Sequence, residues 1–194
     1  MLFSAEYLQK KYDQNGMRYE DFVASGREEG HHFKWLQRYE TLELDADQKK
    51  LANSFTREMH VLTLTGTWCG ECSLQGSALA RIAEVNPEKI RLRFLPRDPN
   101  ADMMVKLKIN GGYRVPVTFF CAEDFEPVSV FGDRTLSRYR AIASQTTGAK
   151  CPPMGSTGLP DDPVREVLNE MLREVERVHL VLRTSARLRE KHGD

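Results

Sequence analysis

Two cysteines separated by two residues are the part of this sequence whose types and spacing point most directly to chemistry. Cys69 and Cys72 lie in the run TWCGEC (67–72), whereas Cys121 and Cys151 stand alone. Four cysteines in 194 residues are too few for a disulfide scaffold. In a reducing compartment, such a pair is more often catalytic or metal-binding than a structural bridge.

Metal binding is the main alternative use of the cysteine pair. A tetrahedral site made only of cysteines would also need Cys121 and Cys151, which are not spaced as a second zinc knuckle. The neighbouring His31 and His32 suggest ligands by type, but adjacent side chains on a helix diverge. We therefore expect no metal site in this chain.

The local pattern places the cysteine pair at the start of a helix. Residues 59–65 (MHVLTLT) predict a buried β-strand, and apolar residues then recur at helical spacing from 74 to 85. The first N–H groups of a helix have no partner within it, and the positive end of the helix dipole lies there. Cys69 is therefore expected to ionise readily and attack, with Cys72 one turn inward as the resolving thiol.

The residues around the cysteines fit a surface that receives another chain. Gly70 has no side chain, so a partner's backbone can approach closely there. Trp68 provides one wall of the expected substrate surface. We expect both residues to contact substrate.

The central part of the sequence alternates strands and helices. After the first strand and a helix over 73–85, the pattern predicts a strand at 90–95, a helix at 102–109, strands at 115–121 and 127–131, and a helix at 136–144. This order predicts an α/β domain in which helices join parallel strands and an antiparallel hairpin follows.

Helical segments are expected on both sides of this central part. In the first, the pattern predicts one helix capped by Ser4 and ending near Tyr12, one with Phe33, Leu36 and Tyr39 at helical spacing, and one that starts near Asp45. We divide the chain into a helical extension (1–57), a core (58–147), a Gly- and Pro-rich linker (148–160) and a C-terminal helix (161–194). The apolar stripe of that last helix is expected to dock on the core rather than to form a coiled-coil dimer.

Charge and hydropathy exclude several classes of function. The 28 basic residues balance 28 acidic ones, which argues against a general nucleic-acid binder and against attachment to anionic lipid. No apolar run approaches the ~20 residues that a membrane span requires. The first residues turn polar after three positions, unlike a signal peptide. We therefore expect a cytoplasmic protein with no nucleic-acid or membrane partner.

The motif resembles the Trp-Cys-Gly-Pro-Cys active site of the thioredoxins. Arg114-Val115-Pro116 resembles their cis-proline segment, and Phe131-Gly132 resembles the end of their last strand. The resemblance covers residues 58 to 147, and the stretch 97–116 is also similar to a bacterial thioredoxin-like subfamily. It implies a thioredoxin-like fold, with a mixed sheet flanked by helices. It also implies a cis peptide bond before Pro116, beside the sulfurs, with the backbone of Val115 free to pair with an extended substrate.

Two positions depart from the thioredoxin pattern. The buried aspartate that assists the resolving cysteine in thioredoxins corresponds to Thr63, which cannot act as a base. Glu71 replaces the proline of the motif, and its carboxylate is expected to disfavour the thiolate of Cys69. A less stable thiolate makes a less oxidising disulfide, so Glu71 predicts a reductase rather than an oxidase.

The sequence thus predicts a disulfide reductase whose only redox group is the Cys69–Cys72 dithiol, with no organic cofactor. Its expected substrate is a disulfide in a protein or a small molecule, and its electrons would come from a reductase or a small thiol. We expect a monomer, or a weak homodimer through the C-terminal helix. The alternative is a redox-inert thioredoxin-like module that binds a partner protein.

Overall fold

The computed structural model describes residues 2–147 and 162–194. Its strands are β1 (Met59–Thr65), β2 (Ile90–Pro96), β3 (Val117–Ala122) and β4 (Pro127–Gly132). Its helices are α1 (Ala5–Asn15), α2 (Tyr19–Ala24), α3 (His32–Thr41), α4 (Ala46–Asn53), α5 (Gly70–Val85), α6 (Ala101–Met104), α7 (Leu136–Thr147), α8 (Pro163–Thr184) and α9 (Ala186–His192), with a 3₁₀ turn, η1 (Asp98–Asn100).

The strands form one mixed sheet in the order β2-β1-β3-β4. β1 pairs in parallel with β2 and antiparallel with β3, and β3 pairs antiparallel with β4. The predicted parallel pair followed by an antiparallel hairpin is therefore confirmed. Every residue of β1 is buried, because helices cover both faces of the sheet at its centre. β1 ends in the turn that leads to the cysteine pair, so a rigid element positions that turn.

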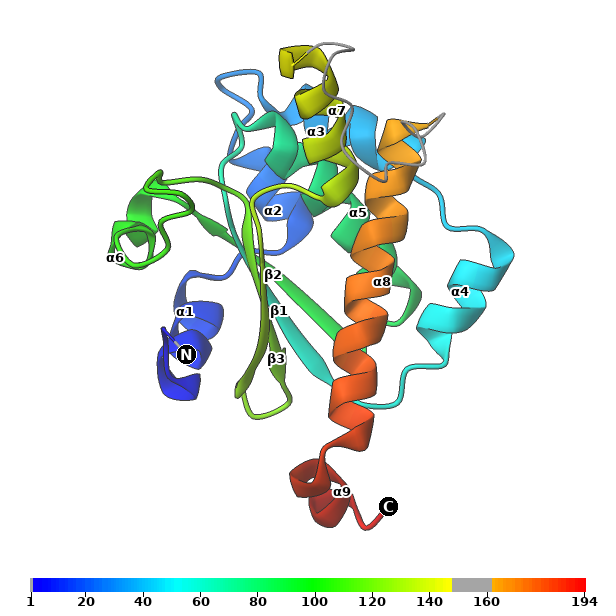
Figure 1. Cartoon of the computed structure of the whole chain (residues 1–194). Helices are drawn as coiled ribbons and strands as arrows, with labels where there is room; N and C mark the ends of the chain where they lie inside the picture. The colour runs from blue at the N-terminus through cyan, green and yellow to red at the C-terminus, as the bar shows by residue number, and fades with distance from the viewer. Residues whose placement is uncertain (1, 148–161) are drawn as a thin grey trace.

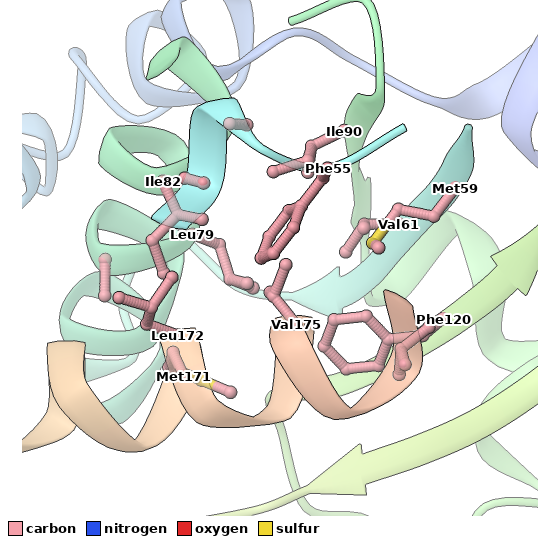
Figure 2. Close-up of a cluster of buried hydrophobic side chains, with 14 of the residues drawn as sticks. Phe55, Met59, Val61, Leu79, Ile82, Ile90, Phe120, Met171, Leu172 and Val175 are labelled. Atoms are coloured by element: carbon pink, nitrogen blue, oxygen red, sulfur yellow. The ribbon is translucent and has the colours of Figure 1, made fainter. Parts of the chain in front are cut away.

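The long helix α8 packs on the core, as its apolar stripe predicts. Met171, Leu172 and Val175 face Leu79 and Ile82 of α5, within a cluster that also contains Phe120 of β3 (Figure 2). The described part of the C-terminal segment is two helices rather than the single helix predicted. The backbone of Ser185 is extended, so α8 ends at Thr184 and α9 follows at its far end (Figure 1).

Two amino-terminal helices, α1 and α4, begin where the sequence predicts, whereas α2 was not predicted and α3 buries an unexpected face. The Ser4 hydroxyl caps α1, and Asp45 caps α4 through a reciprocal pair with Gln48. In α3, Trp35 is fully buried, whereas Phe33 is 69% exposed and Leu36 is 42% exposed. The helical spacing of Phe33 and Leu36 therefore predicts the wrong buried face of α3.

The close approach of α3 to α5 explains why Trp35 is the buried residue. A Cβ added at Gly76 of α5 would lie 2.4 Å from the Trp35 ring, so only glycine leaves room for the indole. The ring packs edge-on against Phe22 and Phe94 in the second core cluster. Tertiary packing, rather than the spacing within α3, decides its orientation.

Three further predictions need correction or fall outside the structure. The helix predicted at 102–109 ends at Met104, and the chain turns again at Asn110, whose φ is +47°. The strand predicted from residue 115 begins at Val117. The predicted linker, with Cys151, lies outside the described residues. In the parts of the chain that are described, no helix has the length and apolar character of a membrane span.

Candidate active site

Cys69 is the N-cap residue of α5, directly after the turn that follows β1. Its backbone is extended, at φ −86° and ψ 123°, and its Sγ accepts a hydrogen bond from the backbone N–H of Cys72 at 3.2 Å. The sulfur thus occupies the place that a serine or aspartate oxygen takes in most helix caps. The predicted position of Cys69 at the start of a helix is confirmed.

The surroundings of Cys69 favour its ionised form. A hydrogen bond from the Cys72 thiol outweighs the opposing effect of burial, and the N–H groups of Cys72 and Glu71 add to it, so that the pKa of Cys69 falls to about 7. The residue is only half-buried, so another molecule can reach it. The thiolate is thus abundant near neutral pH and accessible.

Cys72 is the opposite kind of thiol. It is fully buried, and burial followed by the neighbouring Cys69 raises its pKa well above the ordinary value. The Thr65 side chain and the N–H of Gly66 act in the other direction, since both favour its thiolate. Cys72 therefore stays protonated while Cys69 is ionised, and donates its proton toward that sulfur.

The peptide bond between Val115 and Pro116 is cis and lies beside the cysteines. The carbonyl oxygen of Val115 is 3.6 Å from the Cys69 Sγ. Pro116 directly precedes β3, whose Val117 pairs with Leu64 near the end of β1. The sheet register thus brings the two segments together, and the cis bond expected from the resemblance is confirmed.

The turn that carries Trp68 is tied to the amino-terminal helices. The indole nitrogen of Trp35 donates to the carbonyl of Thr67 at 2.8 Å, and His31 lies 3.2 Å from the Thr67 hydroxyl. Trp68 itself is 48% exposed, with the Arg97 guanidinium over its ring at 4.6 Å. Trp68 and the exposed Gly70 therefore border the accessible side of Cys69.

A cavity of about 750 Å³ opens beside Cys69. It is lined by residues of α3, α5, α7, the start of α8, the turn before α5 and the loops before β3 and after β4, among them Trp68, Gly70, Val115, Arg114 and Asp133. The predicted residues Cys69, Glu71, Trp68, Gly70 and Val115 all lie at this cavity, whereas Pro116 and the buried Cys72 and Thr63 do not line it. The structure thus gathers the predicted surface residues around one opening.

Comparison with known proteins places the chain in a family. The sequence model of a family described as thioredoxin matches residues 16–144. The chain belongs to the thioredoxin family. No curated protein matches the sequence.

Two solved structures share the fold of this thioredoxin-family chain. One is a protein of unknown function, PA1234, from Pseudomonas aeruginosa, at 19% identity. The other is an HIV epitope-scaffold, at 16% identity. Each alignment covers 88% of this chain and 95% of the other, with a TM-score of 0.61. At these identities the likeness extends to the fold alone.

Thr63 is deeply buried, at the position that corresponds to the thioredoxin aspartate. Its hydroxyl lies 3.1 Å from that of Thr118 on β3, and the two buried hydroxyls hydrogen-bond to each other. Thr65, two residues later and on the same side of the strand, favours the Cys72 thiolate, although its buried hydroxyl makes no hydrogen bond within the described chain. The alternation of a strand places residues 63 and 65 on the same face, so Thr65 could have been predicted as a neighbour of Cys72. The resemblance to thioredoxins pointed only to Thr63.

Glu71 is not the unpaired carboxylate that its place in the motif suggested. Two nitrogens of Arg138 on α7 donate to it, Nη2 at 2.7 Å and Nε at 3.1 Å, and Arg134 lies 3.5 Å away. Its charge does raise the pKa of Cys69, as expected, but it is the weakest of the influences named and the pKa still falls to about 7. Glu71 is thus ion-paired with α7 rather than free beside the sulfur.

Cys121 and the question of metal ligands complete the account of the predicted site. Cys121 is buried four residues along β3 from Val117, and burial followed by the charge of Glu126 raises its pKa to about 12. Its thiol is therefore protonated near neutral pH and shielded from solvent. Within residues 2–147 and 162–194, no three His, Cys, Asp or Glu side chains gather as metal ligands.

Proposed function

We propose that this chain is a thiol–disulfide oxidoreductase that reduces disulfides. The observation that supports it best is the pairing of two unlike thiols: Cys69 is accessible with a pKa of about 7, and Cys72 is buried behind it with a raised pKa. One group is ready to attack at neutral pH, and the other holds its proton until a bond to Cys69 must be broken.

The reaction proceeds in two exchanges. The Cys69 thiolate attacks one sulfur of the substrate disulfide, forms a mixed disulfide and releases the other sulfur as a thiolate. Cys72 then loses its proton and attacks the Cys69 sulfur, which forms the Cys69–Cys72 disulfide and releases the second substrate thiol. The protein gives up two electrons and the substrate takes them, so no further redox group is needed in this half of the cycle.

The pKa of Cys69 supports the reducing direction. Thioredoxins, which are reductants, have a value near ~7, whereas strong oxidants with the same motif have values near ~3.5. A separate reductase or a small thiol would return the protein to the dithiol state. We propose that it does so in the cytoplasm, where thiols are kept reduced, with the protein acting as a monomer or weak homodimer.

Insulin reduction in the presence of dithiothreitol tests this function. We expect the chain to accelerate insulin precipitation, Cys69→Ser to abolish the acceleration, and Cys151→Ser to retain it. When Cys72→Ser is reduced, freed of dithiothreitol and then mixed with insulin, the mixed disulfide on Cys69 should persist and be detectable by mass spectrometry. If the wild-type chain gives no acceleration, while Cys69→Ser still binds the same partner proteins, the chain is instead a redox-inert binding module.

A further inference from the structure

Among the charged side chains that line the cavity beside Cys69, basic ones are in excess. Five basic side chains and two acidic ones face it, which leaves an excess of three positive charges, or two when Cys69 is ionised. The chain as a whole has no net charge. The excess is therefore a property of this cavity, and a concave surface of one sign raises the local concentration of ligands of the other sign.

Three of the five basic residues already have partners in the protein. Arg138 is held by Glu71, while Arg134 and Arg114 lie 2.9 Å and 3.2 Å from Asp133. Although burial alone would raise the pKa of Asp133, hydrogen bonds from the Tyr139 hydroxyl and Arg114 hold it below the ordinary value. Both carboxylates of the cavity are thus fully engaged, and neither is free to neutralise another cation.

Lys34 and Arg38 are the remaining two, and they are unpaired among the residues that the structure describes. They lie four residues apart on α3, so they share one face of the helix. The Lys34 Nζ is 3.7 Å from the place that a Cβ on Gly70 would occupy, next to Cys69. The Arg38 Nε is buried and has no hydrogen-bond partner in the described chain. A buried donor without an acceptor is costly, so this one is suited to an acceptor that arrives with a ligand.

We propose that this cavity binds small disulfides whose two arms carry carboxylates, and that Lys34 and Arg38 bind those carboxylates while Cys69 attacks the disulfide. This inference rests on the proposed reductase function and names its substrate class. A volume of about 750 Å³ suits a small molecule. Lysine and arginine bind carboxylates with charge-assisted hydrogen bonds, which are stronger than neutral ones.

The two exchange steps are those described for the proposed reductase, and a substrate carboxylate lies against Lys34 and Arg38 during both steps. The Cys69 thiolate displaces one carboxylate-bearing thiolate and leaves the other arm bound to the protein as a mixed disulfide. The carboxylate of that arm stays against the cations of α3 while Cys72 attacks the Cys69 sulfur and releases it. Two electrons pass from the protein dithiol to the small disulfide, which becomes two thiols.

Three disulfides of similar size and different charge test the proposal: 3,3′-dithiodipropionate with two carboxylates, bis(2-hydroxyethyl) disulfide with none, and cystamine with two ammonium groups. The rate at which each oxidises the reduced full-length chain is divided by its rate with dithiothreitol, which removes differences in leaving-group reactivity. At ~10 mM salt we expect the dianion to exceed cystamine by about tenfold, and the ratio to approach one at ~0.5 M salt.

A double variant assigns the effect to α3. Lys34→Gln/Arg38→Gln should lower the ratio of dianion to neutral disulfide by about threefold, to a value near one. Its matched control is Lys10→Gln/Lys50→Gln, which removes the same charge from exposed positions on α1 and α4 that do not line the cavity. The control should change the ratio less than twofold. The neutral disulfide corrects each variant for any change in the ionisation of Cys69.

The outcomes separate this proposal from the function on which it depends. If all three disulfides react with no preference for charge, the substrate class is wrong and the reductase function stands. If the preference survives in Lys34→Gln/Arg38→Gln, these two residues do not bind the substrate and the proposal falls. If none of the disulfides oxidises Cys69, both proposals fail. If an acidic peptide disulfide reacts ten times faster than dithiodipropionate, the substrate is a polypeptide and the small-molecule proposal is overturned.

Discussion

Replacing Cys72 by alanine should raise the pKa of Cys69 by about one to two units, from about 7 to about 8 or 9. The hydrogen bond from the Cys72 thiol is the largest influence on that pKa, and it is lost in Cys72→Ala, whereas the backbone N–H donors remain. Hydrogen bonds to charged groups contribute about 1.5–3 kcal/mol, and one pKa unit corresponds to about 1.4 kcal/mol. Cys72→Ser retains a hydroxyl donor, so its shift should be smaller.

The assay is the rate of alkylation by iodoacetamide between pH 5 and 10. It is done in a Cys151→Ser background, because Cys121 is buried and only Cys69 should then react. At pH 7 the thiolate fraction falls from about one half to between ~10% and ~1%. A thiolate of higher pKa is more nucleophilic, however, so the rate itself falls only about two- to sixfold. The inflection of the pH profile is therefore the quantity to compare.

The order of the three inflections shows whether the Cys72 thiol lowers the pKa of Cys69. We expect the wild-type chain to have the lowest, Cys72→Ser an intermediate one and Cys72→Ala the highest, with melting temperatures that show all three to be folded. An inflection near pH 7 in Cys72→Ala would refute the reasoning. The start of α5 alone would then set the ionisation of Cys69, and the buried thiol would contribute nothing to it.

Three other predictions concern the ion pair at the motif, the docking of α8 and a buried histidine. Arg138→Gln should raise the pKa of Cys69 by up to about one unit in the same alkylation assay, because the carboxylate beside it loses its main counter-charge; an unchanged pKa would show that this carboxylate does not act on the sulfur. Met171→Ala should lower the free energy of unfolding in urea by about 2–5 kcal/mol, against less than ~0.5 kcal/mol for the exposed Leu180→Ala; equal losses would mean that α8 is not docked. Burial, followed by the charges of nearby arginines, lowers the pKa of His179 to about 4, so the free energy of unfolding should decrease as the pH falls from about 6.5 towards 4. His179→Gln should reduce that decrease by about 1–3 kcal/mol. An identical acid transition in the variant would exclude His179 as the cause.

The motif and the strand before it could be predicted from sequence because their signals are local. Residues 59–65 are apolar and β-branched, and they match β1 at both ends. The place of Cys69 at the helix start follows from the change of period directly after that strand. Such features depend on a few consecutive residues, so no knowledge of the rest of the chain was needed.

The electrostatics of the site could not be predicted in the same way. Glu71 and Arg138 are 67 residues apart, and nothing in their spacing indicates that they meet. Likewise, the buried face of α3 depends on the space that Gly76 leaves on another helix, which allowed Trp35 to displace the face marked by Phe33. Both outcomes arise from contacts between distant segments, which a pattern within one segment does not contain.

The tie between Trp35 and the carbonyl of Thr67 also limits how far the chain can be trimmed. A fragment that starts at residue 58 would keep the sulfurs but lose the indole that anchors their turn, and it would leave the aromatic ring of Phe94 and the bare surface of α5 at Gly76 open to water. Exposed apolar surface of that kind favours self-association. The family model itself begins at residue 16, so we expect the smallest fragment that folds to include the helices before the central residues.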